Sequence, residues 1–566
     1  MEAFLVLSLF ALLATSFSSA HIVEHSFTVK DLNVTRLCNT QTITAVNGRV
    51  PGPRIVVREN DTLVVHVLNA SPHNVTIHWH GIFQKGSQWA DGPEYITQCP
   101  IRPGQKYTYK FTIKGQEGTL WWHAHSSFLR TYVYGALIIR PPHGRPYPFP
   151  KPHKEVPILL GEWWKSDIIQ IFNRIQVTGD LVPPSDAFTI NGFPGDLYNC
   201  SRDHTFKFKV KQGKTYLLRI VNTNIISQMF FKVANHKFTV VAVDAGYTTP
   251  YVTDVVVIAP GQTTDVLLKA DQPVGSYYMA ASAYVTTQVI GFDNTTTRGI
   301  VVYEGASKAI LPSMPVLPAY NDTPTAHKFY TNITGLAGGP HWINCPRIVD
   351  ERMFITVGLN LDFCAQNGTC LGPMGFRYSA SMNNESFVIP SDKGSSMLEA
   401  FFNDASGVYT RDFPDKPPVL LDYTNPNISF DLSRIFAPKS TKVKTLKFNS
   451  TVEIVFQNTA FVGIENHPMH IHGMNFYVLA QGFGAFNQNR DRRKFNLVNP
   501  QMRNTVAVPT GGWAVIRFKA KNPGIWLVHC HIDAHLPWGL AMAFEIENGP
   551  TPETTVPAPP DDLPKC

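Results

Sequence analysis

Short hydrophobic segments, separated by clusters of Gly, Pro, Asn and Asp, recur along the whole chain. Representative segments are rich in β-branched and aromatic residues and cover residues 62–69, 107–113, 216–222 and 238–244. This composition and length are typical of β-strands, and the clusters between them are typical of turns. Gly (39) and Pro (43) are plentiful, whereas long stretches with helical periodicity are scarce. The pattern predicts an all-β protein built of sandwiches or barrels.

One pattern occurs three times: a turn, a strand, and then a glycine that opens a second strand. The glycines are Gly118, Gly275 and Gly524. A second repeated strand lies upstream of each copy. Repetition at this scale predicts three copies of one β-domain. At the fifth and seventh positions after the glycines stand His123 and His125, Ala280 and Ser282, and His529 and His531; the upstream strands lead to His78 and His80, Phe231 and Val233, and His470 and His472.

Pro-rich composition near residues 142 and 318 places the domain boundaries. We therefore expect domain 1 over 21–142, domain 2 over 143–318 and domain 3 over 319–566. Domain 2 keeps the repeated strands without histidines, which makes it a spacer, whereas domains 1 and 3 carry the candidate metal ligands. The pattern over 320–410 does not place individual strands.

Residues 1–20 form an apolar run that ends in small residues and predict a secretory signal peptide. A membrane anchor is the alternative, but the run is short for a membrane span. Secretion also fits the many Asn-x-Ser/Thr sequons. They are Asn33, Asn69, Asn74, Asn199, Asn294, Asn321, Asn332, Asn367, Asn384, Asn427 and Asn449.

The formal charge of +7 comes from dispersed Lys and Arg that form no long basic block. A mild positive excess favours loose association with anionic cell-wall polymers. No nucleic-acid-binding motif and no further transmembrane stretch is present, so we expect neither a nucleic-acid partner nor a membrane partner.

Ten of the twenty histidines fall into four clusters that each contain a His-x-His pair. On a strand this spacing sends both imidazoles to one face, within reach of shared metal ions. Cys530, between His529 and His531, then faces the opposite side, so one segment could serve two metal sites. Imidazole and thiolate suit copper and zinc, and His467, Cys530 and His535 match the two-histidine, one-cysteine set of blue copper.

The motifs His-Trp-His-Gly (78–81), Trp-His-Ala-His (122–125), His-Pro-Met-His-Ile-His-Gly (467–473) and His-Cys-His-Ile-Asp-Ala-His (529–535) resemble those of the blue multicopper oxidases. Within that family the chain is most similar to plant laccases, over the whole mature chain. The resemblance implies three cupredoxin-like Greek-key β-barrel or sandwich domains. It also implies a secreted, extracellular enzyme of the apoplast or cell wall, and we expect a monomer.

The resemblance further implies four copper ions and assigns their ligands. It gives type 1 copper to His467, Cys530 and His535, type 2 copper to His78 and His470, and the type 3 pair to His80, His123, His125, His472, His529 and His531. The implied reaction is one-electron oxidation of phenols such as monolignols with reduction of dioxygen to water, in lignin or phenolic polymerisation or turnover. Electrons would enter at an exposed edge of His535 and pass from Cys530 through the backbone to His529 and His531.

Six further residues bear on the chemistry. Leu540 occupies the position where ascorbate oxidases have Met, and an axial residue that cannot coordinate should raise the potential of the copper. Oxygen reduction consumes protons, so carboxylates are expected nearby. Asp91 matches a family position thought to help protonation, and Asp533 is a second candidate; a turn or cap role is the alternative for both. Glu162, Trp163 and Trp164 could line a donor site, although core packing is favoured.

Three alternatives remain beside the phenol oxidase. Leu540 disfavours an ascorbate oxidase, and no carboxylate cluster assignable to a metal-ion oxidase is seen. A copper-free structural relative from the cell wall should lack several of the ligands that this chain keeps. If Cys530 binds metal, seven cysteines remain and at least one cannot pair. The resemblance pairs Cys99 with Cys566 and Cys38 with Cys200, and leaves Cys345, Cys364 and Cys370 open.

Overall fold

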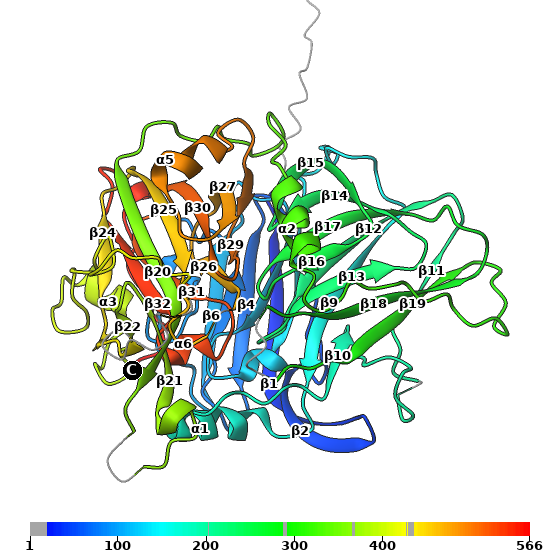
Figure 1. The fold of residues 1–566 in the computed structure, drawn as a ribbon, viewed down its shortest axis with the longest axis horizontal. Coiled ribbons are helices and arrows are strands. Elements are labelled where there is room, and N and C mark those ends of the chain that lie inside the picture. The colour runs from blue at the N-terminus through cyan, green and yellow to red at the C-terminus, as the bar shows by residue number, and fades with distance from the viewer. Residues whose placement is uncertain are drawn as a thin grey trace, which may run out of the picture.

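The computed structural model describes residues 20–201, 203–286, 291–364, 368–425, 427, 435–463 and 465–566. The predicted signal peptide, apart from Ala20, and the sequon Asn367 lie outside these residues. The described chain folds into three successive pairs of β-sheets (Figure 1). In that view the first pair, in blue, lies centrally, the second, in cyan to green, at the right, and the third, in yellow to red, at the left. The predicted all-β class is confirmed.

The first sandwich pairs two four-stranded sheets, of order β2-β1-β4-β6 and β3-β8-β7-β5. The strands are β1 (Ile22–Arg36), β2 (Asn39–Val46), β3 (Ile55–Arg58), β4 (Thr62–Asn69), β5 (Ile77–His80), β6 (Lys106–Thr112), β7 (Gly118–Ala124) and β8 (Tyr134–Arg140).

The second sandwich has sheets of order β10-β9-β12-β17-β14-β15 and β11-β19-β18-β13-β16. Its strands are β9 (Lys154–Trp163), β10 (Ala187–Ile190), β11 (Lys207–Val210), β12 (Thr215–Asn222), β13 (Gln228–Val233), β14 (Phe238–Val243), β15 (Gly246–Thr253), β16 (Val256–Ile258), β17 (Thr263–Lys269), β18 (Ser276–Tyr284) and β19 (Thr296–Tyr303).

The third sandwich has sheets of order β21-β20-β25-β30-β27-β28 and β24-β32-β31-β26-β29, with β22 and β23 paired beside them. Its strands are β20 (Glu351–Asp362), β21 (Arg377–Met382), β22 (Ser386–Phe387), β23 (Lys439–Ser440), β24 (Val443–Leu446), β25 (Thr451–Asn458), β26 (His467–Ile471), β27 (Phe476–Phe483), β28 (Gln501–Arg503), β29 (Thr505–Val508), β30 (Gly512–Lys519), β31 (Gly524–Cys530) and β32 (Ala541–Ile546).

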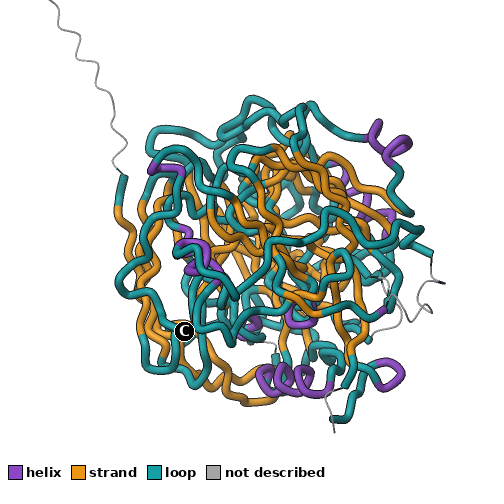
Figure 2. Tube along the Cα trace, turned by 90° about the vertical axis from the view of Figure 1, so that its left-hand side faces the viewer, coloured by secondary structure: helices purple, strands orange, loops and turns teal. Residues whose placement is uncertain are grey.

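The helices are short and lie toward the outside of the molecule, around the strands (Figure 2). This arrangement agrees with the scarcity of long helical patterns in the sequence. They are α1 (Ile168–Thr178), α2 (Thr323–Asn332), α3 (Met397–Phe402), α5 (Gln488–Asp491) and α6 (His535–Trp538), with single 3-10 turns such as η1 (Gln88–Ala90), η2 (Leu129–Thr131) and η5 (Arg492–Lys494). Among the described residues no helix is both long and apolar enough to cross a membrane.

An order of four strands recurs in all three sandwiches, which confirms the repeat. The order β5-β7-β8-β3 of the first sandwich recurs as β13-β18-β19-β11 and as β26-β31-β32-β24. In each case the outermost pair is parallel and the others are antiparallel. The strands β7, β18 and β31, which begin at or next to the repeated glycines, therefore occupy equivalent places.

Disulfides connect distant parts of the fold. Cys38 bonds Cys200 and Cys99 bonds Cys566, as the resemblance implies. Of the three cysteines left open, Cys364 bonds Cys370, and Cys345 is free and buried. The odd cysteine that the count predicts is therefore Cys345.

Asn69 belongs to a sequon but is buried, with no measurable exposure. Its amide donates to the carbonyls of His73 and Ile101, both at 2.7 Å, and its Oδ1 accepts from the Ser71 hydroxyl at 2.7 Å. Asn222 and Asn458 end the equivalent strands and likewise donate to carbonyls, Asn222 to those of Ser227 and Ile258 and Asn458 to that of Glu465. Asn69 is thus a structural asparagine, and Asn222 and Asn458 have the equivalent place in the other two repeats.

Candidate metal centre

Two antiparallel strand pairs, one in the first sandwich and one in the third, present the predicted His-x-His pairs. β5 and β7 place His78 opposite His123, and β26 and β31 place His470 opposite His529. The second member of each pair stands two residues further along its strand or just past the strand end. Residues two apart on a strand share a face, so each pair contributes adjacent imidazoles.

The two sandwiches bring these eight imidazoles into one buried cluster. The ring centroids of His78 and His472 are 4.1 Å apart, and those of His80 and His470 are 3.9 Å apart. His125 and His529 lie 5.3 Å apart. Seven of the eight side chains are at most 2% exposed, and His125 is half-buried. The eight residues are His78, His80, His123, His125, His470, His472, His529 and His531.

The hydrogen bonds of the rings leave donor atoms free inside the cluster. The Nδ1 atoms of His78, His123 and His470 contact main-chain carbonyl oxygens at 2.7 to 2.8 Å. Their Nε2 atoms are buried and have no hydrogen-bond partner among the described residues. Buried polar atoms without partners are rare, and here they converge as metal ligands do.

Burial, reinforced by repulsion among neighbouring imidazoles, favours the neutral form of seven histidines of the cluster. It keeps the pKa of these seven well below the usual range. Neutral imidazole is the form that binds metal, so the site is preorganised for cations that replace protons. The seven are His80, His123, His125, His470, His472, His529 and His531.

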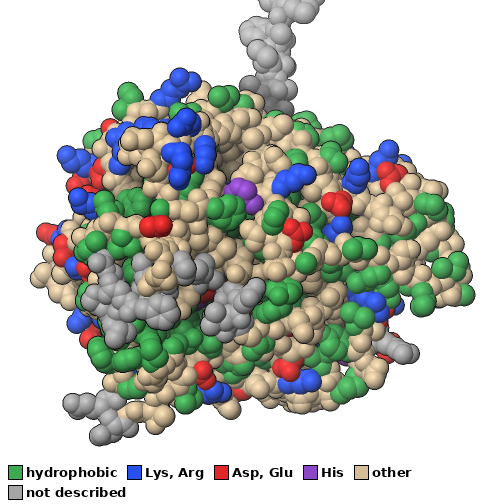
Figure 3. All heavy atoms as spheres, viewed as in Figure 1, with side chains coloured by type: hydrophobic (Ala, Val, Ile, Leu, Met, Phe, Trp, Pro, Cys, Tyr) green, Lys and Arg blue, Asp and Glu red, His purple; other side chains and the backbone are tan. Residues whose placement is uncertain are grey.

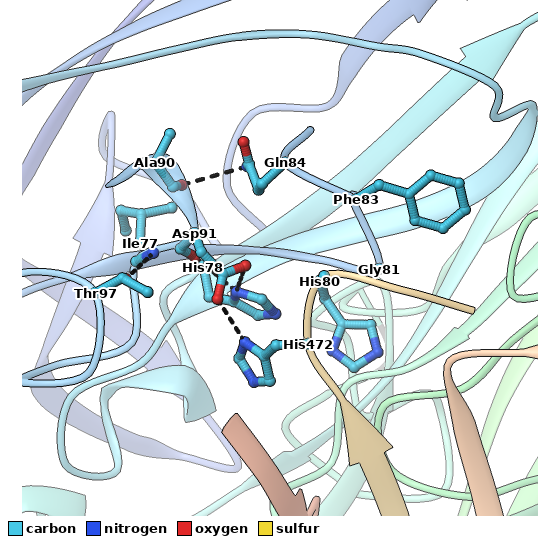
Figure 4. Close-up of polar contacts among 12 residues, drawn as sticks. Ile77, His78, His80, Gly81, Phe83, Gln84, Ala90, Asp91, Thr97 and His472 are labelled. Carbon is cyan, nitrogen blue, oxygen red and sulfur yellow. Dashed lines mark hydrogen bonds and ion pairs between the residues drawn. The ribbon is translucent and has the colours of Figure 1, made fainter. Parts of the chain in front are cut away.

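Asp91, predicted beside the site, lies directly against two of its histidines (Figure 4). Its carboxylate accepts a hydrogen bond from Nδ1 of His472 at 2.8 Å, and its main-chain carbonyl accepts one from Nδ1 of His78 at 2.7 Å. The residue follows the 3-10 turn η1 and is completely buried. Asp91 of the first sandwich therefore orients a histidine of the third.

Asp533 is connected to the histidine cluster through Arg130. Its carboxylate is 3.1 Å from the buried guanidinium of Arg130, and Arg130 also contacts Nδ1 of His531 at 2.7 Å. Burial raises the pKa of Asp533 to about 6, although Arg130 opposes the shift. Asp533, Glu94 and His125 share the lining of one cavity of about 140 Å³.

Arg130 and Asn504 are site residues that the sequence analysis does not identify. The carboxamide Oδ1 of Asn504 lies 3.0 Å from Nε2 of His80, and the main-chain carbonyl of Asn504 accepts a hydrogen bond from Nδ1 of His470. Gly81 leaves room for this contact: a Cβ there would lie 2.4 Å from Nδ2 of Asn504, and its φ is +85°. Neither Arg130 nor Asn504 belongs to a repeated motif.

A second cluster forms on the opposite side of β31. The thiol of Cys530 lies 3.3 Å from Nδ1 of His535 and 3.7 Å from Nδ1 of His467. All three residues are buried. Cys530 therefore faces away from His529 and His531, as strand alternation predicts, and the chain itself connects the two clusters through adjacent peptide units.

The expectation of an exposed edge on His535 is wrong. Its side chain is only 4% exposed, because Trp538 stacks on the ring and Glu465 approaches Nε2 to 3.1 Å. Burial lowers the pKa of His535, but Glu465 and Cys530 outweigh burial and raise it to about 10. By contrast, burial lowers the pKa of His467 to about 3. Glu465, missed by the sequence analysis, stands two residues before a predicted ligand.

The remaining candidates are structural neighbours. Leu540 is buried, and its carbonyl accepts from the amide of Cys530 at 3.1 Å. Trp163 and Trp164 are at most 2% exposed, which confirms core packing. Glu162 accepts hydrogen bonds from the amides of Ile225, Ile226 and Ser227, so it holds a loop of the second sandwich.

Geometry and donor chemistry together fit copper. His467, Cys530 and His535 bring their ligand atoms within 4.8 Å of one another, and so do three sets drawn from the eight-histidine cluster. A thiolate with two imidazoles suits blue copper, and all-imidazole sets suit copper as well. The second sandwich has buried Ala280 and Val233 at equivalent positions, and neither side chain can coordinate a metal.

Comparison with known proteins agrees with this site. Models of the multicopper oxidase family match residues 28–144, 154–306 and 412–550. The chain is 60% identical to Laccase-7 of Arabidopsis thaliana, over 99% of this chain and 98% of the relative, and 54% identical to Laccase-24 of Oryza sativa subsp. japonica, over 99% of both.

Solved structures show the same architecture. The crystal structure of a laccase from Botrytis aclada superposes with a TM-score of 0.73 at 28% identity, covering 95% of this chain and 89% of that one. Fet3p, described as a multicopper oxidase that functions in iron import, shares the fold with a TM-score of 0.72 at 21% identity, covering 96% and 98%. With its three matching domains, its full-length relatives and its two clusters of copper-binding donors, the chain belongs to the multicopper oxidase family and is a laccase of the plant type.

Proposed function

We propose that this laccase oxidises phenols such as monolignols in one-electron steps and reduces dioxygen to water. Four copper ions would be bound. The proposed ligands are His467, Cys530 and His535 for type 1 copper, His78 and His470 for type 2 copper, and His80, His123, His125, His472, His529 and His531 for the type 3 pair.

The position of Cys530 is the observation that carries this proposal. When bound, copper would supply one-electron redox chemistry at the cluster of Cys530 and multi-electron chemistry at the eight-histidine cluster. The chain supplies the connection, because Cys530 belongs to one cluster and its neighbours His529 and His531 belong to the other. A short covalent path of this kind suits transfer of single electrons collected from separate donor molecules.

Carboxylates are available for the protons that oxygen reduction consumes. Asp91 accepts a hydrogen bond from His472 inside the cluster, and Asp533 reaches the same region through Arg130 and the cavity that it shares with His125. We assign Asp91 to orienting His472 and holding a proton near the cluster, and Asp533 to proton supply from the cavity.

His535, the proposed entry point for electrons, is buried. A phenol would therefore contact the residues that cover His535 and not the imidazole itself. The carboxylate of Glu465 lies 3.1 Å from Nε2 of that ring. Leu540 cannot coordinate copper and so offers no thioether to the cluster of His467, Cys530 and His535, which favours a high potential suited to phenols. The role in lignin assembly or phenolic turnover follows from the radicals that such an oxidation releases.

We also propose secretion to the cell wall, a monomeric state and domain limits at 142 and 318. The apolar start of the sequence and the sequons support secretion, and the Pro-rich stretches support the domain limits. The sheet pairs of the three sandwiches lie within residues 22–140, 154–303 and 351–546.

Oxygen uptake with a panel of donors tests the function. Rapid uptake with monolignols and other phenols, and slow uptake with ascorbate and ferrous ion, is the expected result. Preferred oxidation of ascorbate would instead favour an ascorbate oxidase. Purified protein without bound copper and without the visible thiolate–copper absorption would favour a copper-free structural relative.

A further inference from the structure

The outer face of the six-stranded sheet in the third sandwich carries an apolar groove outside the copper clusters. Along β20, Met353 and Ile355 enter the core, so alternation turns Arg352 and Phe354 outward. β25 runs parallel beside it and pairs Val455 with Phe354. This face therefore presents apolar side chains next to a cationic one.

Residues 486–497 pack over part of this face and leave a groove of about 220 Å³. Phe354, Phe486 and Phe495 line it with half-buried rings. The centroid of the Phe486 ring lies 6.5 Å from the centroid of each of the other two. Arg352, Lys416 and Arg492 also line the groove, and all three are exposed.

Two of the three cations of the groove are available to a ligand, whereas Arg352 lies 3.7 Å from Glu453 and both acids are already paired. Arg492 and Lys416 form no ion pair with any residue that the structure describes. Glu453 pairs with the buried Arg517, and Asp415 lies 2.8 Å from Nζ of Lys444. The groove therefore has a surplus of positive charge.

A buried carboxylate holds the neighbouring cationic turn in place. Asp491 is completely buried and lies 2.7 Å from Arg490 and 2.8 Å from Lys494. Arg492 and Arg493 remain exposed on the same turn. The space-filling view shows Lys and Arg gathered at the upper left, over α5 (Figure 3). The four cationic residues within 490–494 are thus an exception to the dispersed distribution of Lys and Arg that the sequence analysis describes.

We propose that this groove binds uronic-acid residues of an acidic polysaccharide. Aromatic rings pack against the apolar face of a sugar ring, and Arg and Lys pair with its carboxylate. The groove is smaller than pockets of about 300–1,000 Å³ that enclose a whole drug-sized ligand. It therefore holds one sugar, while neighbouring carboxylates of the polymer meet the exposed cations of the turn.

Binding of the full-length holoenzyme to polygalacturonate tests this proposal, with polyglutamate as an anion that has no sugar ring. The double substitution Arg492→Glu and Lys416→Glu should weaken binding to polygalacturonate about tenfold or more. Phe495→Leu should remove the preference for polygalacturonate over polyglutamate and leave the polyglutamate affinity unchanged. Oxygen uptake with a soluble phenol should stay at the parent rate in both variants, because none of these residues contacts a copper ligand.

A matched control separates a site from net charge. Lys207→Glu and Lys209→Glu, on the exposed side of β11 at the far right of Figure 1, change the charge by the same amount. This variant should retain polygalacturonate binding to within about twofold. Equal losses in the two double variants, equal affinity of the parent for both polymers, or tighter binding to single-stranded DNA would each overturn the proposal. Phenol oxidation is measured separately from polysaccharide binding. A protein that does not oxidise phenols can therefore be distinguished from one whose groove does not bind the polysaccharide.

Discussion

Replacing Asp91 with Asn tests whether one carboxylate links the two halves of the histidine cluster. The substitution keeps the size of the side chain and the main-chain carbonyl that accepts from His78. It removes the negative charge that accepts the hydrogen bond of His472 at 2.8 Å, where both residues are completely buried. The change therefore isolates a charge-assisted hydrogen bond.

The size of the effect follows from that bond. Hydrogen bonds to charged groups contribute about 1.5–3 kcal/mol, and neutral ones contribute about 0.5–1.5 kcal/mol. The substitution should therefore remove about 1–1.5 kcal/mol of the free energy that holds the His472 ring in its orientation. This corresponds to about tenfold in affinity. Residues that orient metal ligands typically change metal affinity about 10–100-fold, so we expect a loss at the lower end of that range.

Copper retained per chain during titration with a chelator measures the affinity. Stopped-flow kinetics should show slower reoxidation by oxygen with unchanged reduction of the type 1 site by the donor. Asp265→Asn is the matched control, since Asp265 is a buried carboxylate paired with Arg219 at 2.9 Å in the second sandwich. Parent-like copper retention and reoxidation in Asp91→Asn would refute the reasoning, as would an equal loss in the control.

Three other substitutions probe separate parts of the molecule. Leu540→Met should lower the potential of the type 1 copper with a stability change under about 1.5 kcal/mol, and a redox titration without a decrease would contradict the axial argument. Cys530→Ser should abolish the visible thiolate–copper absorption, and metal analysis should find three copper ions per chain in place of four. Loss of all copper would disprove two separable sites. Asn69→Ala should destabilise the fold by about 1–3 kcal/mol in denaturant unfolding, since it removes the buried hydrogen bonds of the Asn69 side chain, and should remove no glycan mass. Asn74→Ala, at an exposed position of the same loop, is its control, and a glycan lost with Asn69 would show the burial argument to be wrong.

The sequence was sufficient for the features that depend on local periodicity. Alternation along β31 predicts that Cys530 and His529 face opposite sides, and the glycine-anchored repeat predicts which strands are equivalent. Site residues that lie outside the repeated motifs cannot be predicted in this way. Arg130 and Asn504 reach the cluster through contacts with His531 and His80, which lie about 400 residues away in the sequence. No spacing rule connects such positions.

Burial and long-range pairing account for the other differences. The sequence places His535 at a donor site but cannot show that Glu465 and Trp538 cover it, because those contacts depend on how a loop and α6 pack. Residues 320–410 gave no strand pattern, since β20 pairs in parallel with β25 about 100 residues later and receives its register from that partner. Cys364 and Cys370, likewise, lie within the part of the chain whose strands were not placed.

The histidine cluster also has a consequence for the lifetime of the protein. Its imidazoles come from the first and the third sandwich. Ions bound there would add a cross-link to packing, to buried contacts such as Asp91 with His472, and to the Cys99–Cys566 disulfide. Ligands that bind only the folded state add their binding free energy to its stability. Poor copper supply would then reduce the abundance of this laccase as well as its turnover, because unloaded chains open more often and are degraded faster.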